Sequence, residues 1–214
     1  ETLIVSMDPV AKNLSSMSQK FKENTMKIEE NNSILDRLAQ NIQKTITAEA
    51  DKLISIAIKK IINNNKEFFQ ENMRILAMVK TLHKTNAPAV SEEHKEHISS
   101  NYNLLLSKNK ELMSQSEKKQ RECQKTIKAR LKTHLKAVNS RLAEAEIDEI
   151  VNDEKRAKEI VQAELLGPAH LKIINYVEDI NEKYKDIELL EENVGLLHDM
   201  IQQMAELIND QTEA

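Results

Sequence analysis

The sequence predicts an all-α protein. Its 214 residues include only two Gly and three Pro, too few turn-forming residues for a sheet of many short strands. Charged residues make up 31% of the chain and aromatic residues only 3%, a composition typical of long helices with one solvated and one buried face. Apolar residues also recur at helical spacing through long stretches without Gly or Pro.

Residues 17–86 contain neither Gly nor Pro, and their apolar residues form two successive series. A single helix here would extend roughly 105 Å at 1.5 Å per residue and leave both apolar series without an internal partner. We therefore expect two antiparallel helices, with a break between Thr45 and Ser55. The first series is Phe21, Ile28, Leu35 and Ile42, and the second is Ile54, Ile58, Ile61, Phe68, Ile75, Val79 and Leu82.

A third helix is predicted from Ser91 to about Leu135. Pro88 closes the second helix, and Ser91 is a suitable N-cap because Glu92 and Glu93 follow it, where the helix dipole favours acids. After an N-terminal segment 1–16, residues 17–136 thus form an antiparallel three-helix bundle. The third helix buries one apolar face, formed by Ile98, Tyr102, Leu105, Leu112, Cys123, Ile127 and Leu131.

Residues 137–168 are predicted to form a partly helical linker. Gly167-Pro168 ends it, since Gly favours a helix C-terminus and Pro cannot continue the helix. The linker contains two short amphipathic pieces, Ile147-Ile150-Val151 and Ile160-Val161-Leu165-Leu166.

Residues 169–214 are predicted to form a fourth long helix, able to pack on the bundle, with a seven-residue apolar repeat. β-Branched residues at one position and Leu or Met at the other are typical of a coiled coil, and a polar residue such as Gln211 sets its register. Apolar spacing of this kind also occurs in helices of ordinary globular bundles, so the number of partner strands does not follow from it. The eight residues of this coiled-coil seam are Ile187, Leu190, Val194, Leu197, Ile201, Met204, Ile208 and Gln211.

The fourth helix resembles the syntaxin family. Residues 190–200, LEENVGLLHDM, are similar to the L-E-x-x-I-x-x-L-H-D-M-F stretch of plasma-membrane syntaxins, and 204–211, MAELINDQ, continue the match. The His-Asp-Met triplet in register with the heptad is the specific part. Weaker similarity covers 34–42, ILDRLAQNI, in the first helix and the Cys123, Ile127, Leu131 spacing in the third. Residues 145–150, AEIDEI, resemble the acidic linker turn of the family.

The resemblance implies a target-membrane SNARE of the Qa type, without enzymatic activity, that acts in vesicle docking and membrane fusion during exocytosis. Residues 17–136 would be the regulatory domain, and 169–214 the N-terminal half of the SNARE motif, with Gln211 at its central layer. Partners would be an SM-family (Sec/Munc-type) protein in a closed state and SNAP-25-like and synaptobrevin-like proteins in an open one. The implied location is the cytoplasmic face of the plasma membrane, through a C-terminal anchor that this chain does not include.

Further implications concern the linker and the N-terminus. Ile147, Asp148 and Ile150 would help to hold the closed state, because they form an acidic and apolar island between the bundle and the fourth helix. The short N-terminal peptide by which many syntaxins bind their SM partner is not visible in residues 1–14.

Catalytic and cofactor sites are not expected. Two glycines can hardly build a phosphate-binding loop, and His94 and His97 have no further ligands at a recognisable metal-binding spacing. Cys123 on an apolar face is expected to be a small core residue. We therefore predict no catalytic residue, no metal and no cofactor.

Charge is distributed unevenly along the chain. Residues 118–136 contain eight Lys or Arg against one acid, whereas residues 178–213 contain eleven acids against two Lys. The two segments could attract each other, which favours an intramolecularly paired or solvated basic face. The alternative function is a helical scaffold or membrane-surface bundle that binds anionic lipid through the basic third helix. Nucleic acid is not expected as a partner, because the basic run has no interleaved aromatic residues.

Overall fold

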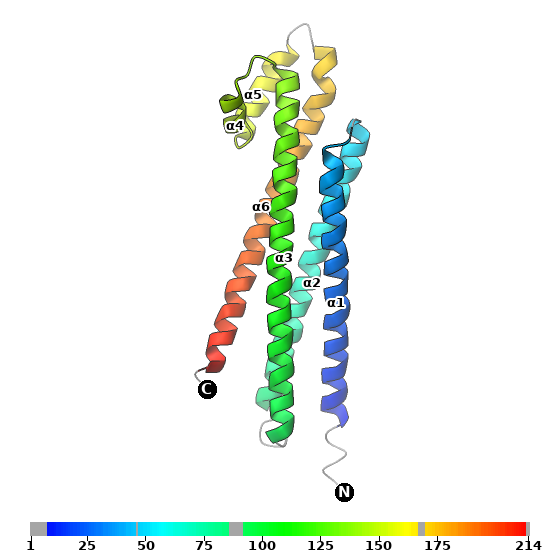
Figure 1. Cartoon of the computed structure of the whole chain (residues 1–214), viewed down its shortest axis with the longest axis vertical. Coiled ribbons are helices and arrows are strands. Elements are labelled where there is room, and N and C mark those ends of the chain that lie inside the picture. The colour runs from blue at the N-terminus through cyan, green and yellow to red at the C-terminus, as the bar shows by residue number, and fades with distance from the viewer. Residues whose placement is uncertain (1–7, 46, 86–91, 167–169, 213–214) are drawn as a thin grey trace. The chain divides into compact units, whose positions relative to one another are not determined.

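The computed structural model describes residues 8–45, 47–85, 92–166 and 170–212, and it confirms the all-α prediction (Figure 1). The described residues form four long helices and two short ones, with no strand among them. None of these helices is long and apolar enough to cross a bilayer. The helices are α1 (Asp8–Ile42), α2 (Ala48–Thr85), α3 (Glu92–Val138), α4 (Glu144–Ile150), α5 (Glu154–Leu165) and α6 (His170–Thr212).

The first helix begins and ends earlier than predicted. It starts at Asp8, and Pro9 is tolerated there because the first turn of a helix does not use its N–H groups. It ends at Ile42 and α2 begins at Ala48, so the break begins before Thr45 and ends inside the expected range, Thr45 to Ser55. The Thr47 hydroxyl accepts a hydrogen bond from the Ala50 N–H at 3.3 Å and so caps the start of α2.

The linker contains the two short helices that its apolar residues predict. Ile147 and Ile150 are the buried residues of α4, and Val161 is buried in α5. Asp153 caps α5, because its side chain accepts a hydrogen bond from the Arg156 N–H at 3.0 Å. Leu166, expected in the second apolar piece, is 88% exposed. The predicted helix signals at Pro88, Ser91, Gly167 and Pro168 lie outside the described residues.

Two compact units make up the chain, and each contains parts of α1, α2, α3 and α6. Unit 1 comprises Glu1–Asn32, Asn63–Glu117 and Leu196–Ala214, and unit 2 comprises Ser33–Ile62 and Lys118–Gly195, which includes α4 and α5.

Unit 1 has an apolar core that is crossed by hydrogen-bonded polar layers. In the first layer, Asn24 of α1 donates to Asn72 of α2 at 3.1 Å, and Asn72 donates to Asn109 of α3 at 3.0 Å. Asn109 also contacts the sulfur of Met204 in α6 at 3.6 Å. A side-chain amide is stable in an apolar core only when it has hydrogen-bond partners. Each layer therefore fixes the register of the helices. The apolar core around the layers includes Phe21, Ile28, Phe69, Leu76, Leu106, Leu112, Met113 and Leu197.

A second polar layer shows that α1 and α2 are antiparallel in unit 1. Asn65 donates to Asn32 at 3.1 Å, and Ser116 donates to the same oxygen, also at 3.1 Å. Between the two layers the residue number rises along α1 and falls along α2, as the prediction requires. Asn65 and Asn72 take core positions of α2, and Phe69, four residues after the first and three before the second, lies on the same helical face. Phe69 is therefore fully buried, whereas the predicted Phe68 is only partly buried.

Unit 2 has its own core, to which the linker helices contribute. Leu35 and Ile42 of α1 and Ile58 of α2 are fully buried in it. Pairs between α3 and α6 show that these two helices are antiparallel, because Gln120 bonds Asn193 whereas His134 contacts Asp179. The other buried members include Ile62, Cys123, Ile127, Leu131, Leu135, Ile147, Ile150, Val161, Ile180 and Leu190.

Candidate functional site

The candidate site is the seam of α6, and both units bury their share of it. In unit 2, Ile187 and Leu190 belong to the apolar core and are 6% and 0% exposed. In unit 1, Leu197 and Met204 are likewise core residues, at 1% and 0%. Val194 is buried, whereas Ile201 is half-buried and packs against the core of unit 1. The side chains of Ile208 and Gln211 lie outside the described residues.

The seam extends farther towards the N-terminus than the sequence interpretation placed it. Counting back from Ile187 in the same spacing reaches Lys183, Ile180, Tyr176 and Ile173. Ile173, Ile180 and Lys183 are buried, and Tyr176 packs against the core of unit 2. The continued 3-4 spacing is a signal of this extension in the sequence. Lys183 interrupts the apolar repeat, so a search for apolar residues alone ends the seam at Ile187.

A polar row accompanies the seam on one side of α6. Asp179, Asp186 and Asn193 each precede a residue of the β-branched seam position, and each is buried. Met200 continues the row in unit 1. Asn193 donates to the Gln120 side chain of α3 at 2.8 Å. The buried face of α6 is therefore wider than that of a helix in a two-stranded coiled coil, which buries mainly the two seam positions.

A cluster of buried charges lies at the start of this row in unit 2. Lys183, 1% exposed, forms ion pairs with Asp51 of α2 at 3.7 Å and with Asp179 at 3.5 Å. Asp51 also pairs with Arg130 of α3 at 3.3 Å, and His134 of α3 contacts the Asp179 carboxylate. Buried charges require such partners, because an isolated ion in the protein interior is strongly unfavourable.

Asp51, His134 and Asp179 together have the composition of a metal-binding triad, with potential ligand atoms within 4.8 Å of one another. The Lys183 ammonium already lies against both carboxylates. A divalent cation would be repelled by that ammonium and by Arg130, so this cluster is an ion-pair network rather than a metal centre.

The two acids of α6 respond to this environment in opposite ways. Burial acts to raise the pKa of Asp179, but the hydrogen bond with His134 and the charge of Lys183 outweigh it and hold that pKa below its ordinary value. Burial dominates at Asp186 and raises its pKa, although the carboxylate accepts a hydrogen bond from Ser55 and lies 3.6 Å from Lys59. Burial also raises the pKa of the Cys123 thiol to about 12, which makes it unreactive.

The structure separates the three linker residues that the sequence singled out. Ile147 and Ile150 are 1% and 0% exposed and belong to the core of unit 2. Asp148 is exposed and forms an ion pair with Lys132 of α3. The Ile150 carbonyl accepts a hydrogen bond from the Tyr184 hydroxyl of α6 at 2.7 Å. The linker is thus tied to α3 by charge and to α6 by a buried hydrogen bond.

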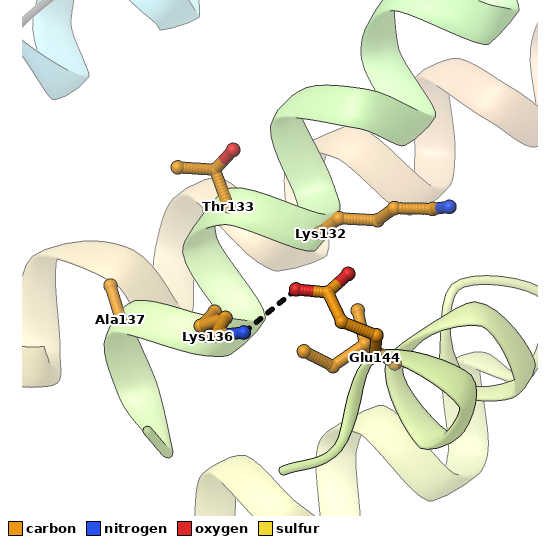
Figure 2. A pocket seen from close by; sticks show the side chains of 6 residues that line it. Lys132, Thr133, Lys136, Ala137 and Glu144 are labelled. Carbon is orange, nitrogen blue, oxygen red and sulfur yellow. Dashed lines mark hydrogen bonds and ion pairs between the residues drawn. The ribbon is translucent and has the colours of Figure 1, made fainter. Parts of the chain in front are cut away.

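A pocket of about 370 Å³ lies where α4 faces the end of α3 (Figure 2). Figure 2 shows Lys136 pointing towards Glu144, with which it pairs at 2.7 Å. Because Lys132 and Lys136 already have acidic partners, the pocket presents little uncompensated charge to a ligand. Its lining is Lys132, Thr133, Lys136, Ala137, Glu144 and Ile147.

Much of the basic run on α3 is paired within unit 2. The acidic partners lie on α1, α2, α4 and α6. The sequence had suggested partners only in the acidic last segment, which belongs to α6. This arrangement supports the interpretation of an intramolecularly paired basic face. The ion pairs are Lys119 with Asp36 at 2.8 Å, Lys128 with Glu191 at 3.5 Å, Arg130 with Asp51 at 3.3 Å, Lys136 with Glu144 at 2.7 Å, and Lys132 with Asp148.

No protein-family model and no curated protein sequence matches the chain. Its fold is similar to that of a chain in the crystal structure of the Unc18–syntaxin 1 complex from Monosiga brevicollis, with a TM-score of 0.69 and 15% sequence identity. The similarity covers 97% of this chain and 90% of that one. The chain therefore has a syntaxin-like fold.

Proposed function

We propose that this protein is a syntaxin-like target-membrane SNARE that alternates between a closed and an open state. In the closed state, α6 packs on the protein's own helices. In the open state, α6 is released and assembles with three partner helices from SNAP-25-like and synaptobrevin-like proteins. Burial of the seam in that assembly would drive vesicle docking and membrane fusion in exocytosis.

The observation that carries the proposal is the burial of the α6 seam by the protein's own helices. Leu190, Leu197 and Met204 are at most 1% exposed, yet the heptad predicts that the same positions bind neighbouring strands of a coiled coil. One apolar surface cannot serve two sets of partners at once. Closure and assembly are therefore mutually exclusive, which is the basis of a switch.

The domain organisation and the remaining partner belong to the same proposal. Residues 17–136 would be the regulatory bundle, 137–168 the linker and 169–214 the N-terminal half of the SNARE motif. An SM-family protein would bind the closed state, in agreement with the similarity to a chain from a Unc18–syntaxin 1 complex. The protein would act at the cytoplasmic face of the plasma membrane.

The test is assembly of this chain with SNAP-25-like and synaptobrevin-like helices, followed by the melting temperature of any complex. Ile208→Asp should block assembly, because it would bury a charge without a partner in the seam. Gln203→Asp is the matched control, since Gln203 is exposed and lies off the seam. If Ile208→Asp assembles as well as the control, the seam is not the interface and the proposal is wrong.

The alternative, a bundle that binds anionic lipid through its third helix, is tested with the same chain. Vesicles with and without anionic lipid should bind it equally weakly, because many of the cations on α3 have acidic partners. Strong binding that depends on anionic lipid and weakens with salt would favour the membrane-surface function instead.

A further inference from the structure

Lys183 occupies a seam position of α6 that the next three heptads fill with apolar residues. The corresponding residues in the next three heptads are Leu190, Leu197 and Met204, each at most 1% exposed. Lys183 is itself only 1% exposed, so its ammonium is held within the core of unit 2. A charged residue at a seam position lowers coiled-coil stability unless the neighbouring helices supply a counter-charge.

That counter-charge comes from two different sources. Asp179, at 3.5 Å, is on α6 and moves with Lys183 wherever the helix goes. Asp51, at 3.7 Å, is on α2 and is available only while α6 is folded back. Asp51 has a second cation, Arg130, at 3.3 Å, so removal of α6 leaves an Asp51–Arg130 pair that is still neutral. Release of α6 therefore leaves Asp51 with a counter-charge, whereas Lys183 loses one of its two acidic partners.

The neighbouring side chains of α6 also fit the helices that cover them in unit 2. Asp186 accepts a hydrogen bond from Ser55, and Tyr184 donates to the Ile150 carbonyl at 2.7 Å. Each of these polar groups is buried and matched to α2 or to the linker. Upstream of Ile187, α6 thus has a face built for its own chain, whereas the face downstream is mainly apolar.

We propose that Lys183 divides α6 into two functional parts and selects the folded-back state for the first of them. The seam from Ile187 onwards serves both the closed and the assembled state. The segment from Ile173 to Lys183 packs only on the protein's own helices, because Lys183 has no partner like Asp51 in an apolar coiled-coil layer. This inference rests on the proposed function, since it concerns the extent of α6 that enters the partner complex.

The first experiment needs no partner protein. Amide hydrogen exchange is followed in residues 173–187 of the intact chain for the wild type, Lys183→Met and Lys185→Met. Lys183→Met should lower protection about tenfold or more, because it removes the ammonium that joins the buried carboxylates of Asp51 and Asp179 across α2 and α6. Lys185→Met should leave protection unchanged, since the Lys185 side chain is 61% exposed. Equal protection in Lys183→Met and the wild type would overturn the proposal.

A double-mutant cycle with Asp51→Asn identifies the cause of the change. Asp51→Asn should also lower protection, and the double variant should lose less than the product of the two single losses. Strictly multiplicative losses would show that Lys183 acts through packing and not through Asp51, which would also overturn the proposal. Far-UV circular dichroism shows whether each variant remains helical. If a variant unfolds, the proposal is tested instead by hydrogen exchange in the wild-type partner complex, described next.

The second experiment uses the assembled complex with SNAP-25-like and synaptobrevin-like helices. In the wild type, exchange protection should begin at about Ile187, and residues 173–183 should exchange at least tenfold faster than residues 187–204. In Lys183→Met, protection should extend upstream to Ile173. Equal protection of both segments in the wild-type complex would overturn the proposal. If no complex forms at all, the proposed function fails, while the exchange experiment on the chain alone still tests the role of Lys183 in the closed state.

Discussion

The Tyr184 hydroxyl of α6 donates a hydrogen bond of 2.7 Å to the Ile150 carbonyl at the end of α4, and both groups are buried. The same carbonyl also accepts a hydrogen bond from the Asp153 N–H at 2.9 Å, so Tyr184 supplies its second donor, from another helix. Burial also raises the pKa of the Tyr184 phenol, which keeps the donor proton in place at neutral pH. This bond connects the linker to the helix that carries the candidate site.

Tyr184→Phe should destabilise the protein by about 0.5–1.5 kcal/mol, the net contribution of one hydrogen bond, because the Ile150 carbonyl keeps its bond from the Asp153 N–H. Urea unfolding gives the free energy, and hydrogen exchange should show the largest loss of protection in α4. Tyr176→Phe is the matched control, because Tyr176 is only half-buried and its ring contact with His134 is retained. Equal effects of the two variants would show that the Tyr184 hydroxyl contributes nothing specific.

The linker should hold the closed state mainly through Ile147 rather than through Asp148. Ile147→Ala removes a side chain that is 1% exposed and should cost about 2–5 kcal/mol. Asp148→Ala breaks an exposed ion pair with Lys132 and should cost about 0–1 kcal/mol. Assembly with partner helices should accelerate strongly in the first variant and little in the second. Similar rates in both would contradict this division.

The opposite pKa shifts of Asp179 and Asp186 predict opposite dependence of stability on pH. Because its folded-state pKa is lowered, Asp179 contributes stability that is present above its unfolded-state pKa and is lost as the pH falls through the folded-state value. Asp186 has a raised pKa, so its contribution is complete below its unfolded-state pKa and is lost as the pH rises through the folded-state value.

Asp179→Asn should accordingly destabilise the protein at neutral pH and have little effect in acid. Asp186→Asn should be neutral or stabilising at neutral pH, because the amide oxygen can still accept the hydrogen bond from Ser55 without burying a charge. Thermal unfolding of both variants between about pH 3 and pH 7 spans the range in which aspartates titrate. A pH-independent loss in Asp179→Asn would contradict the role of its ionised form.

Gly195→Ala should stabilise α6 without affecting the seam. Gly195 is exposed, has an ordinary helical backbone, and an added Cβ would meet no atom within 4 Å. Replacement of Gly by Ala inside a helix gains about 0.8–1 kcal/mol. The melting temperature of the chain should rise, while the composition of any partner complex should not change. A lower melting temperature would show that the glycine has a steric role.

Local periodicity was sufficient to predict the all-α fold and the two linker helices. Phe21, Ile28, Leu35 and Ile42 recur every seven residues and are all buried, because one helical face can be identified from the residues of that helix alone. The buried α6 residues Ile187, Leu190, Val194, Leu197 and Met204 follow from the same kind of periodicity, and their role as a partner-binding seam stays a prediction. The first helix was predicted to begin too late, because apolar spacing does not report that Pro9 fits the first turn of a helix. It also does not report the side-chain hydrogen bond by which Thr47 caps the start of α2.

The positions at which polar residues replace apolar ones in the core depend on contacts between different helices. Asn72 is buried because Asn24 and Asn109, far from it in sequence, complete its hydrogen bonds. Lys183 continues the seam because Asp51 approaches it from another helix. The periodicity of one helix contains no information about such partners. A buried polar group is stable only when a second element pairs it, so its position depends on how the helices meet and cannot be read from any one of them.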